Sequence, residues 1–141
     1  MVTAAECLKK WGEPSASNPC MTLWDVPTNL EIGVIPKRIY CNKLMVEPLS
    51  KAFTLLVARG LADDIKTWDG CFNIRKSRGL NSLSLHSWGV AIDIDAFENG
   101  LGKQPKLNPL IVACFKEAGF DWGGDWVRRL DGMHFQLSKI N

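Results

Sequence analysis

The sequence has 141 residues, which is the usual size of one domain and leaves little room for a second. Hydrophobic residues make up 46% and charged residues 23%, so disorder, collagen and coiled coil are excluded as descriptions of the whole chain. The 17 Lys and Arg residues against 15 Asp and Glu give a net charge of +2. That charge is too small to indicate a nucleic-acid-binding protein.

The sequence shows no membrane span and no disulfide pattern. No apolar run approaches the roughly 20 residues that cross a bilayer, and the segment Met1 to Trp11 lacks the apolar core of a secretory signal. We therefore expect a protein that is made in a cytosol and stays there unless something else releases it. The 5 cysteines form no Cys-x-x-Cys pair, which argues against a disulfide framework and against a thiolate zinc site.

The N-terminal quarter is predicted to be irregular. Residues 12–36 are rich in Pro, Ser, Asn and Gly, which favours loops and turns. Apolar residues such as Trp24, Val26 and Ile35 nevertheless favour burial. We expect residues 1–36 to wrap irregularly around a core formed by residues 37–137.

Two helices are expected after this region. In residues 47–59, Pro48 is tolerated in a first turn and the apolar side chains follow helical spacing. Residues 108–118 begin with Asn108, a good N-cap, and are closed by Gly119.

Three segments are predicted to be strands: residues 70–75, 89–95 and 133–137. In the second, Val90, Ile92 and Ile94 alternate with Ala91, Asp93 and Asp95. In the third, His134 and Gln136 share the face opposite to Met133, Phe135 and Leu137. Helices and strands follow no regular βαβ rhythm, so we predict a single α+β domain with a mainly antiparallel sheet packed by helices.

The alternation predicts a cluster of metal ligands. Asp93 and His134 lie on the polar faces of two strands, and His86 comes just before the first of these. If the two strands are neighbours, two imidazoles and one carboxylate converge. Zinc in catalytic sites takes three such ligands and keeps a position for water, whose pKa it lowers towards about 7. The same ligand set also holds ferrous iron in oxygenases, and residue types alone do not separate the two metals.

Two further aspartates lie close to these ligands in the sequence. Asp131 stands three residues before His134, and Gly132 between them lets the chain turn so that both can face one site. A carboxylate there that is not a ligand suits the general base of a metallohydrolase. Asp95 shares a face with Asp93, so it either hydrogen-bonds a ligand histidine from behind or is merely a polar residue at the surface.

Two motifs resemble those of a known family. The run Ser84 to Asp93, SLHSWGVAID, resembles the pattern S-x-H-x-x-G-x-A-x-D, and Trp126 to Phe135 resembles W…D-x-M-H-F. These patterns are typical of the zinc D-alanyl-D-alanine carboxypeptidases, which share a fold with the Hedgehog signalling domain. The sequence is most similar to the phage endolysins of that family, the L-alanyl-D-glutamate peptidases. Shared features cover about residues 37–137.

The resemblance implies a role for each of these residues. It implies that His86, Asp93 and His134 hold Zn²⁺ and that Asp131 is the base. Arg75 and Ser84 match positions that contact substrate in the family. A guanidinium suits a carboxylate of a peptidoglycan stem peptide, although Arg78 competes with Arg75 for this role and Ser84 can instead cap the loop of His86.

The resemblance implies a hydrolase of bacterial peptidoglycan. We expect it to be a monomer with no nucleic-acid partner and no transmembrane segment. We expect it to cleave the L-Ala–D-Glu bond, to remain in the host cytoplasm until a holin opens the membrane, and then to act on the cell wall in the periplasm. One alternative is a D-Ala–D-Ala carboxypeptidase with the same zinc site. A second is a non-enzymatic, Hedgehog-like zinc-binding module, and a third is a ferrous-iron oxygenase.

Overall fold

The computed structural model describes residues 1–141 and contains a four-stranded antiparallel sheet. Its strand order is β3 (Trp68–Gly70), β4 (Ala91–Ile94), β6 (His134–Leu137) and β5 (Phe120–Trp122). With the helices described below, this confirms the predicted α+β class. The central pair, β4 and β6, carries most of the predicted ligands, so its register decides whether the site forms.

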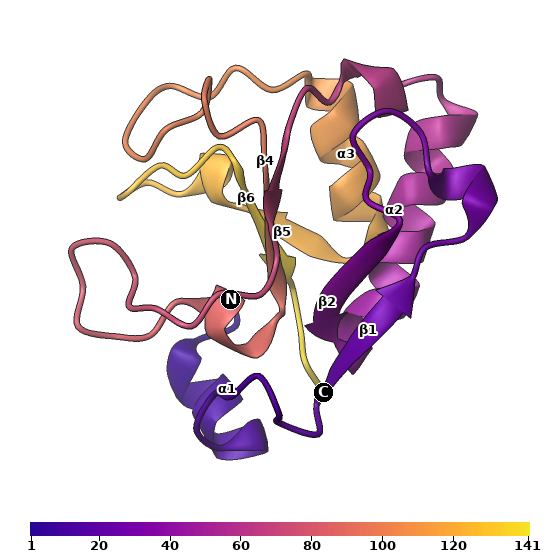
Figure 1. Ribbon diagram of the computed structural model, residues 1–141. Helices are drawn as coiled ribbons and strands as arrows, with labels where there is room; N and C mark the ends of the chain where they lie inside the picture. The colour runs from indigo at the N-terminus through magenta and orange to yellow at the C-terminus, as the bar shows by residue number, and fades with distance from the viewer.

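Two helices pack on one side of this sheet. They are α2 (Val46–Ala58) and α3 (Pro109–Ala118), and Figure 1 shows them side by side, with the long loops on the other side of the sheet. Both helices were expected from their apolar spacing, and the Asn108 side chain caps α3 by accepting a hydrogen bond from the Leu110 amide. The ring of Phe115 stacks on that of Phe135 at 4.5 Å between centroids. This packing holds β6 rigidly against α3.

The N-terminal region is more regular than expected. Helix α1 (Ala4–Trp11) begins at a capping box in which Thr3 and Glu6 satisfy each other's backbone amides. Strand β1 (Met21–Asp25) pairs with β2 (Arg38–Asn42) in a separate two-stranded antiparallel sheet. The prediction of an irregular segment over residues 1–36 was therefore wrong for these two elements, because the prolines lie between the elements rather than inside them.

The first predicted strand is also shorter and earlier than expected. Only β3, Trp68–Gly70, pairs with β4, and its register shifts between Trp68 and Gly70. Gly70 adopts a φ of 121°, a backbone conformation that glycine tolerates and that ends the ladder. Beyond it the chain leaves the sheet and runs towards His86, one of the predicted ligands.

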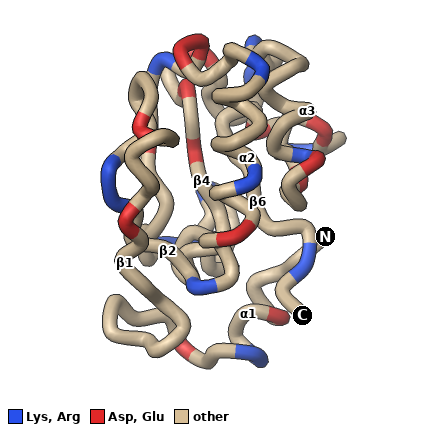
Figure 2. The backbone as a smooth tube through the Cα atoms, turned by 90° about the vertical axis from the view of Figure 1, so that its right-hand side faces the viewer, with Lys and Arg blue, Asp and Glu red and all other residues tan.

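Charge is spread over the fold. Figure 2 shows Lys and Arg interspersed with Asp and Glu along the chain, and neither sign occupies a whole element. None of the helices has the length and apolar character that a membrane crossing requires.

Candidate metal and catalytic site

The register of the two central strands brings two of the predicted ligands together. Asp93 on β4 lies directly opposite His134 on β6. Side chains of directly opposed residues on one face of an antiparallel pair lie within contact distance. The prediction that the two strands are neighbours is therefore correct, and the position of each side chain is fixed by backbone hydrogen bonds rather than by a loop.

The third predicted ligand, His86, lies on the short 3-10 helix η4 (Leu85–Trp88). The Ser84 hydroxyl caps this helix by accepting from the His86 amide at 3.3 Å. Gly89 ends it with a φ of 67°, and a Cβ on Gly89 would meet the Asn42 amide nitrogen at 2.7 Å. Only glycine fits that turn, so the sequence Ser-x-His-x-x-Gly fixes the direction of the His86 ring.

The three side chains form a cluster suited to a metal ion. His86 Nε2 lies 3.2 Å from Asp93 Oδ2, and His134 Nδ1 lies 3.5 Å from Asp93 Oδ1. One ligand atom from each residue falls within 4.8 Å of the others. His86 Nε2 and Asp93 Oδ1 are also the two buried side-chain polar atoms without a hydrogen-bond partner. Buried polar atoms are rarely left unpaired, so this donor set fits a metal that would satisfy both atoms.

Each histidine is held through the nitrogen that faces away from the cluster. The Nδ1 atom of His86 hydrogen-bonds the Cys71 carbonyl oxygen at 2.7 Å, and a carbonyl can only accept. The Nε2 atom of His134 lies 2.9 Å from Gln136 Oε1. The outward hydrogen bond of a ligand histidine sets its tautomer and leaves the other nitrogen free for the metal.

The electrostatics favour an ionised aspartate between the two rings. Burial opposes the charge on Asp93, but its close contacts with His134 and His86 outweigh burial and hold its pKa well below the usual range. Burial works against a charge on His134 as well, yet its contact with Asp93 raises its pKa above the ordinary value.

Asp131 reaches the same site without joining the ligand cluster. Its Oδ2 lies 4.0 Å from His134 Nδ1, and the His134 amide donates to the Asp131 carbonyl at 3.0 Å, closing a turn through Gly132. Burial raises the pKa of the Asp131 carboxyl. A carboxylate with a raised pKa beside a ligand cluster has the position and basicity of a general base.

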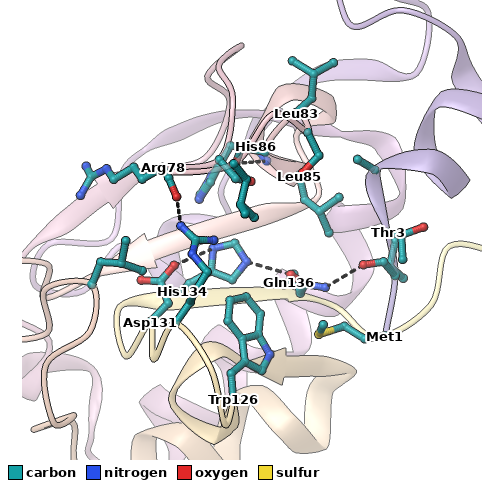
Figure 3. Close-up of a pocket in the computed structure, with 18 of the residues that line it drawn as sticks. Met1, Thr3, Arg78, Leu83, Leu85, His86, Trp126, Asp131, His134 and Gln136 are labelled. Atoms are coloured by element: carbon teal, nitrogen blue, oxygen red, sulfur yellow. Dashed lines mark hydrogen bonds and ion pairs between the residues drawn. The ribbon is translucent and has the colours of Figure 1, made fainter.

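The cluster forms the floor of a cavity of about 510 Å³. We use "floor" for the three ligands with Asp131 and Gln136. Figure 3 shows His86, Asp131, His134 and Gln136 pointing into one space, beside the ring of Trp126. The Trp126 ring lies 5.3 Å from that of His134, so it forms part of the cavity wall.

Four arginines line the same cavity, and we call them the rim: Arg75, Arg78, Arg128 and Arg129. None of them forms an ion pair within the chain. The Arg129 guanidinium donates to the Arg78 carbonyl oxygen and so ties the two rim loops together. The only acidic residues that line the cavity are Asp93 and Asp131. The rim is therefore free to bind an anion.

The remaining predicted residues also lie at the cavity. Arg75 lines it from a backbone that the Ser87 hydroxyl holds in place, and Arg78 lines it beside Arg75. Ser84 is buried and caps η4, which is the second of the two roles considered for it, although it also lines the cavity.

Asp95 requires a correction, because it does not support either histidine. β4 ends at Ile94, and Asp95 adopts a φ of 50°, so it leaves the strand face that it was expected to share with Asp93. Its Oδ1 accepts hydrogen bonds from the amides of Lys66 and Thr67. The partners of the histidines are instead the Cys71 carbonyl and Gln136.

Sequence reasoning missed Gln136 and two of the rim arginines. The signal for Gln136 was present, because it shares a strand face with His134. Arg128 and Arg129 follow Trp126 and Val127 in a loop that has no periodic pattern. Nothing in the sequence alone places that loop opposite Arg75 and Arg78.

A family model described as D-alanyl-D-alanine carboxypeptidase matches residues 78–137. This stretch contains the three predicted ligands and Asp131. The match supports a metallopeptidase. No solved structure matches the chain.

Proposed function

We propose that this chain is a zinc metallopeptidase that hydrolyses a peptide bond in the stem peptides of bacterial peptidoglycan. The observation that carries the proposal is the floor of the cavity, where two histidines and one aspartate converge beside a second, non-ligating aspartate. The family match over the same residues supports the same reaction class. His86, Asp93 and His134 would hold the zinc.

Each residue of the floor has a distinct part in this chemistry. When bound, zinc would polarise the scissile carbonyl and make a water nucleophilic at neutral pH. Asp131 would take the proton from the attacking water and pass it to the leaving amine, a transfer that its raised pKa favours. Asp93 keeps its negative charge between the histidines and so keeps the nitrogens that face it attractive to a cation.

The arginines of the rim favour an anionic substrate. Stem peptides carry free carboxylates, and a guanidinium binds a carboxylate through paired hydrogen bonds. Four arginines without an ion pair line the cavity, which suits a substrate with several carboxylates. We favour cleavage inside the stem peptide, at L-Ala–D-Glu, because the sequence resembles the endolysins, with Arg75 or Arg78 as the main carboxylate ligand.

The alternative within the same chemistry is removal of the terminal D-Ala. The description of the matching family model favours it, and the floor would serve either bond. A non-enzymatic zinc-binding module is the alternative from another class. Asp131 argues against that module, because zinc binding alone requires no unliganded carboxylate with a raised pKa at the site.

The experiment that decides among these functions is mass spectrometry of fragments released from purified peptidoglycan, with and without a zinc chelator. We expect chelator-sensitive release of fragments cut between L-Ala and D-Glu. Loss of only a terminal D-Ala would assign the carboxypeptidase reaction to the same site. Absence of any cleavage by folded, zinc-loaded protein would contradict the proposal and favour the binding module.

As part of the same proposal, the protein acts as a monomeric phage-type endolysin that stays in the host cytoplasm until a holin admits it to the periplasm. The test is expression in a Gram-negative host with and without a co-expressed holin. We expect rapid lysis only with both proteins. Lysis by the chain alone would contradict the holin-dependent step.

A further inference from the structure

The second ligand histidine depends on one buried amide side chain. Gln136 lies two residues after His134 on β6 and is only 3% exposed. Its Oε1 is 2.9 Å from His134 Nε2, and Figure 3 shows it between His134 and the N-terminal segment. If the amide oxygen faces the ring, His134 must carry its proton on Nε2. Its Nδ1, which faces Asp93 and Asp131, then keeps a free lone pair.

The orientation of that amide is fixed by the N-terminal segment. Gln136 Nε2 donates to the Val2 carbonyl oxygen at 3.3 Å, across 134 residues of sequence. A backbone carbonyl can only accept, so the NH₂ group must face Val2 and the oxygen must face His134. Val2 is itself buried, with 6% of its surface exposed. The reversed amide would place two acceptors together at Val2 and two donors together at His134.

A second backbone carbonyl, at the other end of α1, also accepts a hydrogen bond from a side chain close to a predicted ligand histidine. The residue that ends the helix, Gly12, accepts a hydrogen bond through its carbonyl from Trp88 Nε1 at 2.9 Å. Trp88 lies two residues after His86, as Gln136 lies two residues after His134. The segment from Val2 to Gly12 is therefore bonded to the chain next to both ligand histidines, and its packing is coupled to the geometry of the floor.

We propose that Gln136 is a positioning residue that selects the metal-binding tautomer of His134, and that the Val2 carbonyl holds its amide in the required orientation. This inference rests on the proposed function only in that the site holds zinc; it does not depend on which bond is cleaved. Hydrogen bonds to the outward nitrogen of a ligand histidine typically change metal affinity by about 10- to 100-fold.

The first test needs no variant. In zinc-loaded wild-type protein labelled with ¹⁵N, long-range ¹H–¹⁵N correlation spectra distinguish the two ring nitrogens of each histidine. We expect His134 to bear its proton on Nε2, protected from solvent exchange, and His86 to bear its proton on Nδ1. A proton on Nδ1 of His134 would overturn the proposal.

The second test compares two variants of Gln136 by zinc affinity, measured by competition with a chelator of known affinity. Gln136→Met keeps the length of the side chain but removes both polar groups, and we expect zinc binding to weaken about 10- to 100-fold. Gln136→Glu keeps an acceptor for His134 but loses the donor to Val2, so it should lose less zinc affinity than Gln136→Met. Equal losses in the two variants, or no loss in Gln136→Met, would contradict a role in tautomer selection.

A matched control lies on the same stretch of chain. The Ser138 hydroxyl donates to the Gly119 carbonyl oxygen at 2.9 Å, outside the cavity. Ser138→Ala also removes one hydrogen bond near the end of β6, and we expect it to leave zinc affinity and the His134 spectrum unchanged. Because both readouts are independent of peptidoglycan, a protein that binds zinc in this way but cleaves nothing would contradict only the proposed function.

Discussion

The floor and the rim of the cavity are built from different kinds of structure. His134 and Asp93 lie on paired strands with fixed register, and His86 lies on a capped and buried 3-10 helix. The rim arginines lie on loops, and Arg78 and Arg128 are exposed. A reaction needs its groups held within a fraction of an ångström, whereas recognition of a flexible carboxylate does not. Under the proposed function, the metal-binding groups therefore lie on regular elements and the substrate-binding groups on loops.

The largest effect is expected from a substitution of Asp93, the predicted ligand that lies between the two histidines of the floor. We expect Asp93→Asn to lose stoichiometric zinc and all activity, because the amide lacks the charge that holds both histidines ready for a cation. Zinc content after dialysis and peptidoglycan hydrolysis measure the two effects. Asp95→Asn is the matched control: Asp95 is near in sequence but its carboxylate bonds only Lys66 and Thr67, so this variant should retain zinc and activity.

The next largest effect should separate catalysis from metal binding within the floor. We expect Asp131→Ala to keep its zinc and to lose about 10²- to 10⁴-fold in kcat, the usual contribution of a general base. Metal analysis and steady-state kinetics on the same sample are needed. Loss of zinc together with activity would show that Asp131 is a ligand.

The rim should affect binding rather than the chemical step. We expect Arg78→Ala or Arg75→Ala to raise KM, with kcat little changed, because the lost contact is present before and during the reaction. A hydrogen bond to a charged group contributes about 1.5–3 kcal/mol, which corresponds to about 10- to 100-fold in kcat/KM. Arg38→Ala, in an exposed pair with Asp25, should leave both constants unchanged. A fall in kcat alone would contradict the division.

The last expected effect needs no substitution and is a pH dependence of zinc binding. The raised pKa of His134 means that a proton competes with zinc at this residue. Zinc affinity should therefore fall as the pH is lowered through that pKa, by about tenfold per pH unit for each proton displaced. Chelator competition between pH 8 and pH 5.5 tests this, and a flat profile would contradict the coupling between His134 and Asp93.

The sequence predicts the floor better than the rim, for physical reasons. Alternation along a strand fixes which face a side chain takes. The pattern of residues alone therefore placed Asp93 and His134 on the polar faces of their strands. Of the two interpretations of Asp95, support of a histidine is wrong, because the strand ends one residue before it. Arg128 and Arg129 could not be placed, because a loop has no periodicity that indicates its neighbours.

In the fold, too, elements with a local sequence pattern were predicted and an element that depends on a distant partner was not. Helices α2 and α3 were predicted because apolar spacing and capping residues agree with each other. Strand β1 was missed because its five residues, Met21–Asp25, lie among prolines and polar residues and are stabilised by pairing with β2. Such pairing is a long-range contact that composition does not reveal.

The most direct test of the central claim is a zinc titration of the metal-free protein against peptidoglycan hydrolysis. We expect no hydrolysis without metal and a rate of hydrolysis that rises in proportion to added zinc. The rate should saturate at about one zinc per chain, as expected for a single His86–Asp93–His134 site. Full activity in the presence of a strong chelator, or no activity with the site fully loaded, would contradict it.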